Sequence, residues 1–306
     1  MKFLSLLAAL LLEQASPLHE GNRLLLWFKR YALVLEGRLN GGQYRHGVIA
    51  WALAVAPALV VTAKVQLVLN DLSPLAGMLW SVAVLYLTMG FRRFSHFFTE
   101  VQLALHAGDL AAARDWLGKW RGVSAAEFSA GEAARVAIEQ GLLASHRHVF
   151  GTVAWFVALG PAGAILYRAS VVLSELWGAR SEPDFGAFGR FAARAHTWLD
   201  WVPVRLTAAT FAAVGDFEDA VYCWRAQAAA WIPQADGIIL ASGGGALGVR
   251  LGDTLHQHGG LQHRPQLGTG EEADAGHLQQ AAGLIWRALV LCMFLVLLVT
   301  IAQAFG

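Results

Sequence analysis

The sequence predicts an all-α, polytopic helical membrane protein, with about four to five spans and additional helical segments on the cytoplasmic side. Of its 306 residues, 56% are hydrophobic and only 15% are charged, whereas a soluble domain carries about 25% charged residues. Several apolar runs approach the ~20 residues that a helix needs to cross the hydrocarbon core of a bilayer. No segment alternates polar and apolar residues for long enough to predict a strand. We therefore expect one membrane domain over residues 1–306.

Five apolar runs are the candidate spans. They lie near residues 47–69, 75–90, 149–167, 201–217 and 284–302. Only NDLSP separates the first two runs, which predicts a tight membrane hairpin. Gly160-Pro161 should break the third run or turn it back. Because the fourth run contains Arg205, three interpretations of it stay open: a span, a re-entrant segment and a buried helix.

The remaining segments are polar or amphipathic. The N-terminal stretch MKFLSLLAALLLEQASP resembles a signal peptide, but it lacks a small-x-small cleavage site, which favours a retained helix. The pattern of residues 91–148 predicts helices, with a stop and a new N-cap at Gly108-Asp109. Residues 253–280 are rich in glycine and glutamine, which is typical of an exposed loop or a disordered linker.

Charge predicts the orientation and excludes one class of partner. Basic residues flank the first hairpin but are absent from its tip, so the tip should face outward and residues 91–148 the cytoplasm. This arrangement predicts a multi-pass protein of the inner (plasma) membrane, with membrane lipid around it. A net charge of +1 argues against nucleic acid as a partner. The oligomeric state stays open.

A glycine motif lies in SGGGALGVRLG, residues 242–252. Gly243, Gly245 and Gly248 formally match G-x-G-x-x-G, but a dinucleotide site needs a βαβ unit and no second strand follows. A flexible loop or close helix packing is therefore favoured, and a backbone phosphate cradle near Arg250 is the other interpretation.

Two clusters of charged residues lie at the edge of an apolar run. In His146-Arg147-His148 the two histidines point apart on a helix, which argues against a metal site. Two interpretations remain. The triplet places positive charge at the membrane surface, or Arg147 binds a phosphate or carboxylate group.

The second cluster is RFAARAHTWLDWVPVRL, residues 190–206. It places Arg194, His196, Asp200 and Arg205 near one another along a helix. Arginine beside a membrane core is usually paired or functional. Two interpretations stay open, an Arg–Asp structural pair and a polar pocket in which Arg194, His196 and Arg205 hold an anion.

Four stretches resemble, in order and spacing, segments of the CobD/CbiB family of membrane proteins. They are LALHAGDLAAARDWL (103–117), EAARVAIEQ (132–140), FGRFAARAHTWLDWVPVRL (188–206) and GGGALGVRLG (243–252). The resemblance implies that the glycines do not form a nucleotide loop. It also implies adenosylcobinamide-phosphate synthase activity, the ATP- and Mg²⁺-dependent condensation of a corrinoid carboxylate with aminopropanol or its phosphate.

The sequence departs from that family at acidic positions. The family's GRDT becomes RGVS at 121–124, and its DD pair becomes His196-Thr197. Its NTLDSM region becomes SVVLSELWG at 170–178, where only Glu175 is acidic. Such losses are hard to reconcile with Mg²⁺-dependent ligation.

LDWVPVRL at 199–206 is most similar to the AmpE-like branch of the same superfamily, and this gives the leading hypothesis. It is a non-catalytic sensor or signalling modulator, with no metal or cofactor, whose pocket at the cytoplasmic face binds a phosphorylated or lipid-linked small molecule. The proposed pocket residues are Arg147, Arg194, His196, Asp200 and Arg205, with Glu175 and Arg250 as secondary candidates. The alternative is a divergent adenosylcobinamide-phosphate synthase of cobalamin biosynthesis that uses Mg²⁺ and ATP, so the enzyme status stays open. In a third, structural interpretation the cluster only braces the helices.

Overall fold

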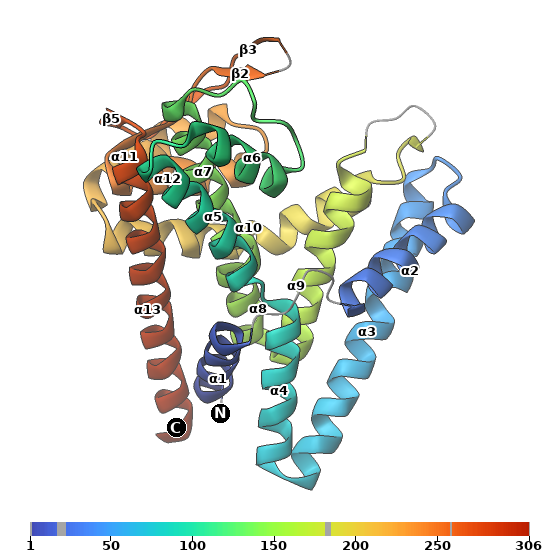
Figure 1. Cartoon of the computed structure of the whole chain (residues 1–306). Helices are drawn as coiled ribbons and strands as arrows, with labels where there is room; N and C mark the ends of the chain where they lie inside the picture. Colours follow the sequence, from blue (N-terminus) through green and yellow to red (C-terminus); the bar gives the residue numbers. More distant parts are fainter. Residues whose placement is uncertain (1, 17–22, 181–184, 258, 306) are drawn as a thin grey trace. The chain divides into compact units, whose positions relative to one another are not determined.

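The computed structural model describes residues 2–16, 23–180, 185–257 and 259–305, and most of them are helical. This confirms the helical class, although the described residues also include five short strands that the sequence did not predict. The chain divides into two compact units. Unit 1 comprises Met1–Gly90, Gly151–Pro203 and Val296–Gly306, and unit 2 comprises Phe91–Phe150 and Val204–Leu295. The division falls within the long helices α10 (Arg190–Val214) and α13 (Ala275–Phe305), which Figure 1 labels.

The other helical elements of unit 1 come from the N-terminal part and the middle of the chain. They are α1 (Lys2–Ala15), α2 (Arg23–Leu39), α3 (Tyr44–Leu72), α4 (Pro74–Thr88), α8 (Gly151–Leu159), α9 (Pro161–Leu173) and the π-helical turn η2 (Ser174–Gly178). A buried core that includes Ala32, Ala50, Ala54, Trp177 and Phe188 joins α2 and α3 to η2 and to the segment before α10. The small alanines let α2 lie close against α3.

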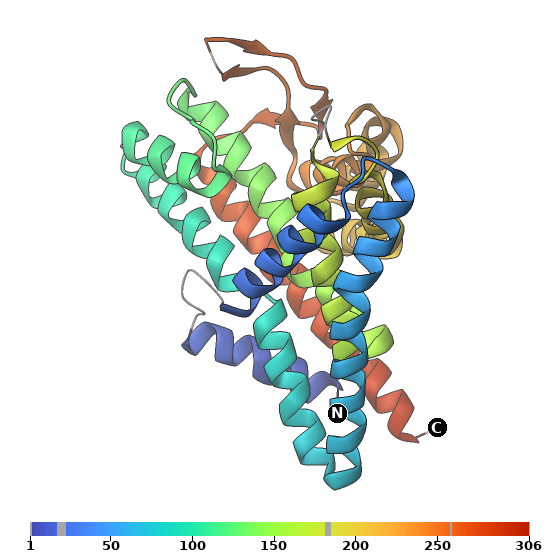
Figure 2. The same ribbon diagram turned by 90° about the vertical axis from the view of Figure 1, so that its right-hand side faces the viewer.

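Helices α3 and α4 form the predicted helical hairpin and lie side by side in both views (Figures 1 and 2). Ser73 ends α3 and caps α4, because its Oγ accepts the N–H of Ala76 at 3.1 Å. Pro74 lies in the first turn of α4, where a missing N–H costs no hydrogen bond. Gly77 allows the close approach, since a Cβ there would lie 1.8 Å from the Asn70 Oδ1.

The third apolar run does not form one continuous helix. It is divided at Gly160, which has a φ of 68°, into α8 and α9. The two arms pack against each other, since a Cβ on Gly163 would lie 2.1 Å from the Trp155 carbonyl oxygen. The chain therefore turns back at Gly160-Pro161. The arm before the turn continues α7 and η1 without a break, and the arm after it continues into η2.

The fourth run is the second half of α10, which begins at the polar residue Arg190. Pro203 lies inside this helix without ending it. The helix ends at Val214, and Asp216 then caps α11 (Phe217–Gln227) by accepting the N–H of Asp219 at 3.1 Å.

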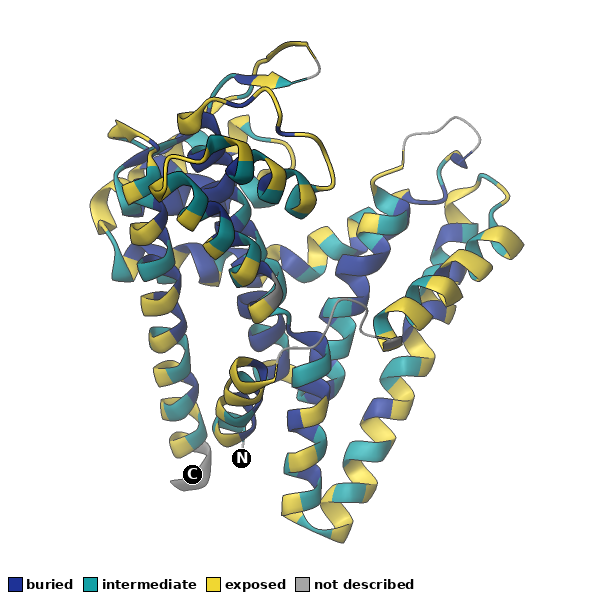
Figure 3. Ribbon diagram, viewed as in Figure 1, coloured by how far each residue is buried: buried dark blue, intermediate teal, exposed yellow. Residues whose placement is uncertain are grey.

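Two of the described helices are long and apolar enough to cross a membrane. They are α3, with a mean hydropathy of 2.0, and the Ala275–Ala302 segment of α13, with 2.6. Only 22% and 28% of these apolar windows is buried, so most of their residues are intermediate or exposed (Figure 3). Helix α4 is apolar but has only 15 residues. The total number of spans stays a prediction.

Unit 2 contains the remaining helices. Besides α11, they are α5 (Phe91–His106), α6 (Leu110–Arg121), α7 (Ala130–Ser145), the π-helical turn η1 (His146–Phe150), the 3-10 turn η4 (Ala228–Ala230) and α12 (Gln234–Leu247). The predicted stop and cap between α5 and α6 are confirmed. Gly108 has a φ of 73°, and the Asp109 carboxylate accepts the N–H of Ala112 at 2.9 Å.

The glycine motif lies largely within α12, and its first two glycines make close helix packing possible. A Cβ on Gly243 would lie 2.7 Å from the Leu142 side chain, and one on Gly245 would lie 2.5 Å from the Asp219 carbonyl oxygen. Gly248 ends the helix with a φ of 65°. The packing interpretation is therefore confirmed, and the flexible-loop interpretation is wrong.

The polar segment 253–280 is more regular than the sequence predicts. Strand β1 (Val249–Gly252) pairs antiparallel with β4 (Gln266–Leu267) and parallel with β5 (Glu271–Glu272). Strands β2 (Leu255–Gln257) and β3 (Gly260–Gln262) form a second, antiparallel pair. The segment is largely exposed, as expected of a loop, but it is not a disordered linker, because short strands order it and carboxylates of α7 bind it.

Candidate functional site

A chain of buried polar side chains links α9 to α10 in unit 1. The Tyr167 hydroxyl donates to the Asp200 Oδ1 at 2.8 Å, and the two residues are 0% and 4% exposed. Gly151 makes room for the tyrosine, since a Cβ there would lie 2.2 Å from the Tyr167 ring. A polar group buried among apolar helices is costly unless it is hydrogen-bonded, and this bond gives each residue a polar partner.

His196 extends the same polar chain. Its Nδ1 lies 3.3 Å from the Oγ of Ser170, which donates to the Tyr167 carbonyl oxygen at 2.7 Å. His196 and Asp200 thus each contact a polar residue of α9, Ser170 and Tyr167, and the sequence did not single out these two partners. The available signal was a tyrosine and a serine, three residues apart, in an otherwise apolar helix.

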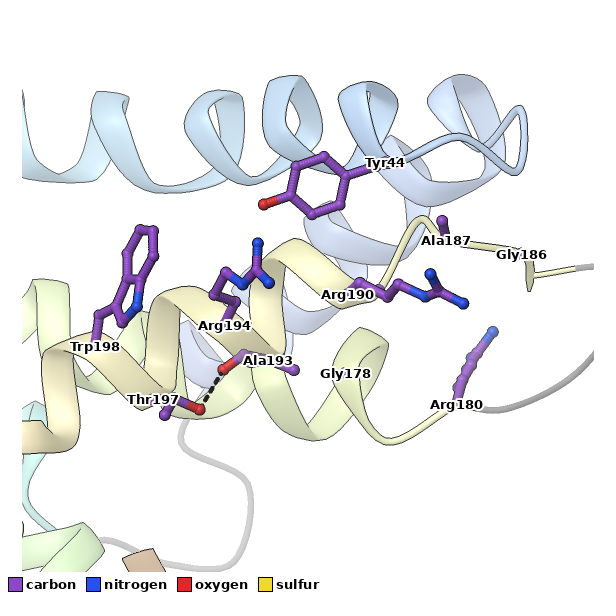
Figure 4. A pocket seen from close by; sticks show the side chains of 11 residues that line it. Tyr44, Gly178, Arg180, Gly186, Ala187, Arg190, Ala193, Arg194, Thr197 and Trp198 are labelled. Atoms are coloured by element: carbon purple, nitrogen blue, oxygen red, sulfur yellow. Dashed lines mark hydrogen bonds between the residues drawn. The ribbon is translucent and has the colours of Figure 1, made fainter. Parts of the chain in front are cut away.

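Arg194 lies on a different face of α10, where it lines a groove of about 900 Å³. The groove is lined by Tyr44, Gly178, Arg180, Gly186, Ala187, Gly189, Arg190, Ala193, Arg194, Thr197 and Trp198. Figure 4 shows that the side chain of Arg194 points toward Tyr44, and that the side chains of Arg190 and Arg180 extend into one part of the groove. The sequence indicated Arg194 as an anion-binding residue, but not Arg180, Tyr44 or Trp198.

The three arginines differ in their protein partners. Arg180 Nη1 lies 2.7 Å from the Glu36 Oε1, and its guanidinium stacks over Phe185 at 5.1 Å. Among the residues that the structure describes, Arg190 and Arg194 have no carboxylate partner. The groove therefore carries more positive than negative charge.

The other predicted residues lie apart from this groove. In unit 2, Arg147 Nη2 donates to both Asp236 oxygens at 2.6 and 2.7 Å, and its neighbour His146 lies 2.9 Å from the Thr207 Oγ1. Arg205 follows Pro203 in α10 and belongs to the same unit.

The two secondary candidates also differ in their surroundings. Glu175 is exposed in the π-helical turn η2 of unit 1. Arg250 lies on β1 of unit 2, where its Nη2 is 3.4 Å from Glu272 Oε1. Its described partner is therefore a carboxylate of the chain itself.

Unit 2 also contains two glutamates of α7 that bind the strand segment. Glu139 accepts two hydrogen bonds from Arg264, at 2.7 and 3.1 Å, and the N–H of Gly252 at 2.8 Å. Glu132 accepts the N–H of Ser129 at 2.7 Å and that of His256 at 2.9 Å. No sequence signal indicated these long-range partners.

Glu132 should make the free energy of unfolding of unit 2 depend on pH in the acidic range. Burial raises the pKa of Glu132, but the hydrogen bonds from Ser129 and His256 outweigh burial and lower it from 4.5 to about 2. A lowered folded-state pKa contributes stability above pH ~4.5 that is lost as the pH falls toward ~2. We expect Glu132→Gln to remove up to about 3 kcal/mol of this pH-dependent part of the unfolding free energy. Unfolding curves of both chains between pH 2 and 6 test this, and parallel curves would contradict it.

The residues present fit a bound Mg²⁺ only in part. Among the described residues, no three histidine, cysteine, aspartate or glutamate side chains come together as a metal site. Mg²⁺, however, is commonly held by one or two carboxylates together with substrate phosphates. The exposed carboxylate of Glu175 fits that smaller role.

The features described so far define a helical protein with apolar, exposed helices and a cationic groove. The family model described as CobD/Cbib protein matches residues 6–285. The cobalamin biosynthesis protein CobD of Stutzerimonas stutzeri is 36% identical over 288 residues, which cover 93% of each chain. The proteins of that name from Chromobacterium violaceum and Mycobacterium tuberculosis are 36% and 29% identical, and cover 79% of this chain in each case. The two alignments cover 76% and 79% of the lengths of those proteins.

The chain therefore belongs to the CobD/CbiB family. No solved structure matches it. These comparisons overturn the leading hypothesis of a non-catalytic sensor or signalling modulator, because the relatives are named as cobalamin biosynthesis proteins. That hypothesis took the loss of acidic motifs as loss of activity. The AmpE-like assignment has no support in the comparisons.

Proposed function

We propose that this chain is an enzyme of cobalamin biosynthesis that forms an amide between a corrinoid carboxylate and aminopropanol or its phosphate, as adenosylcobinamide-phosphate synthases do. The observation that carries the proposal is the 36% identity to a cobalamin biosynthesis protein over 93% of both chains. Alignment over nearly the full length supports a shared activity more strongly than a match to one segment would.

In unit 1, the proposed site residues are Arg194, His196 and Asp200, with Glu175 as a second carboxylate. Arg194 would hold an anionic group of a substrate by charge-assisted hydrogen bonds. Asp200 accepts the hydrogen bond of the Tyr167 hydroxyl, and His196 lies within hydrogen-bond distance of Ser170. Bound Mg-ATP would supply the energy for amide formation, and Glu175 is the carboxylate proposed to contact its metal ion.

In unit 2, Arg147 and Arg205 stay in the proposed set. Asp236 already neutralises Arg147, so an incoming substrate anion would have to take the place of that carboxylate. Arg250 remains a secondary candidate for the same reason, since Glu272 is its partner.

We further propose that the chain is a multi-pass protein of the inner membrane. The long apolar helices α3 and α13 support this, because only 22% and 28% of their apolar windows is buried within the protein. Apolar surface in water is unfavourable by about 25 cal/mol per Å², and lipid would remove that cost. Recovery of the chain in carbonate-washed membranes checks the proposal, and its release into the soluble fraction would contradict it.

The activity can be tested with the purified full chain in detergent, supplied with adenosylcobyric acid, Mg-ATP and either aminopropanol or its phosphate. We expect mass spectrometry to detect the amide product. Asp200→Asn and Glu175→Gln should each lower turnover at least tenfold. The matched control is Glu218→Gln, which changes an exposed carboxylate of α11 in unit 2.

Two results would count against the proposal in different ways. No product with either amine from the folded wild-type chain would contradict the activity itself. Normal turnover in both Asp200→Asn and Glu175→Gln would leave the activity standing and remove these two residues from the site.

A further inference from the structure

The start of α10 concentrates positive charge in an arrangement that is unfavourable by itself. Arg190 is the first residue of the helix and Arg194 lies one turn later, and no acidic residue occurs in the first turn. Like charges four residues apart on a helix repel each other. The first turn is also the positive end of the helix dipole, where cations are disfavoured and anions are stabilised. A bound anion would relieve both effects.

Two partly buried arginines of unit 2 have carboxylate partners. Asp236 holds Arg147 with two hydrogen bonds, and Glu139 holds Arg264 in the same way. Within the described residues, Arg190 and Arg194 have no such carboxylate. Both side chains are exposed at the groove, so their guanidinium groups are accessible to an anion that enters it (Figure 4).

The groove also contains aromatic side chains and has enough volume for an organic group. Tyr44 lies opposite Arg194, and its ring packs edge-on against Phe191 at 5.9 Å, which holds the phenol in place (Figure 4). Trp198 lines the same groove and is 68% exposed. A volume of about 900 Å³ is within the range of small-molecule sites, roughly 300–1,000 Å³. The groove can therefore take a phosphate together with the organic group that carries it.

We propose that this groove binds a phosphate group directly, through Arg190 and Arg194 with help from Arg180, and without a bridging metal ion. The guanidinium group is planar and presents paired N–H donors that match phosphate oxygens. This extends the proposed function, since aminopropanol phosphate is one of the two amines considered for it.

The same chemistry has a second source. Tyr44 is the first residue of α3, and a 29-residue helix is about 43 Å long, so its ends would reach the headgroup layers of a bilayer. The phosphate of an anionic lipid could then occupy the groove instead of a soluble phosphate ester.

The experiment uses the full chain in neutral detergent, without corrinoid or ATP, and with EDTA present. Isothermal titration with inorganic phosphate should show saturable binding. Arg190→Gln and Arg194→Gln should each weaken it about tenfold or more. Glu36→Gln should strengthen it several-fold, because it frees Arg180 from its internal carboxylate. Arg225→Gln, which changes an exposed arginine of α11 in unit 2, is the matched control and should bind as the wild type does.

A second arm identifies the source of the phosphate. The chain is placed in nanodiscs of phosphatidylcholine with or without phosphatidylglycerol, and phosphate titration is repeated. If phosphatidylglycerol competes with phosphate and Arg194→Gln abolishes this competition, the result supports the site and assigns it to lipid. Unchanged phosphate binding in both nanodiscs supports the site and assigns it to a soluble ester.

The proposal is overturned if the folded wild type shows no saturable phosphate binding, if EDTA abolishes binding, or if Arg225→Gln weakens it as much as Arg194→Gln does. Circular dichroism of each variant separates loss of binding from loss of fold. Because no turnover is measured, failure of the phosphate site is distinguishable from failure of the proposed synthase activity.

Discussion

Glu139→Ala is expected to lower the free energy of unfolding by about 3–5 kcal/mol, because it breaks a buried ion pair and leaves one charge without its partner. The Glu139 side chain is 4% exposed and that of Arg264 is 15% exposed. Without the carboxylate, Arg264 keeps hydrogen bonds only to the carbonyl oxygens of Gly252 and Asp253. The N–H of Gly252 also loses its acceptor. Chemical unfolding in mixed micelles, followed by circular dichroism, measures the loss.

Two further variants separate charge from packing. Glu139→Leu combined with Arg264→Met removes both charges and should recover most of the loss, since well-packed apolar pairs can replace a buried ion pair. Glu218→Ala, at an exposed position of α11, should change stability by less than about 0.5 kcal/mol. If Glu139→Ala were no more damaging than Glu218→Ala, the pair would not hold the strand segment to α7.

Gly245→Ala should destabilise unit 2 by about 1–3 kcal/mol through overpacking. The added Cβ would lie 2.5 Å from the Asp219 carbonyl oxygen and 2.8 Å from the Ala220 Cα. These are backbone atoms of α11, so the conflict is relieved only if α11 and α12 move apart. Thermal unfolding of the variant in detergent measures the effect.

Gly37→Ala provides the matched control for that experiment. Gly37 also lies within a helix, α2, but a Cβ there would meet no atom within 4 Å. Alanine in an open helix position is expected to stabilise the protein by about 0.5–1 kcal/mol, because glycine loses more backbone entropy on folding. Opposite signs for the two substitutions support the packing role of Gly245, and equal signs would contradict it.

Local signals predicted the helical elements well. The turn at NDLSP, the cap at Asp109 and the break at Gly160-Pro161 each depend on a few neighbouring residues, and each is present in the structure. The strands at 249–272 were not predicted, because they are two to four residues long and depend on distant carboxylates. Periodicity within a window carries no information about such partners.

The candidate site was predicted in parts. The polar stretch at 190–206 indicated His196 and Asp200 as candidates, but not their partners on α9, Ser170 and Tyr167. Arg194 faces the groove rather than His196's polar chain, since helical geometry places the two residues on different faces. The groove also needs Tyr44 and Arg180, which are far from Arg194 in sequence, and only the tertiary fold brings them together.

The turned-back hairpin of α8 and α9 affects on which side of a membrane the chain continues. A chain that enters a bilayer at Gly151 and reverses at Gly160 leaves it by Leu173 on the side from which it came. Under the proposed membrane setting, the hairpin therefore returns the chain to the same side, whether or not its arms cross the bilayer. A soluble substrate that reaches one end of the hairpin could reach the other end from the same compartment, without any need for transport.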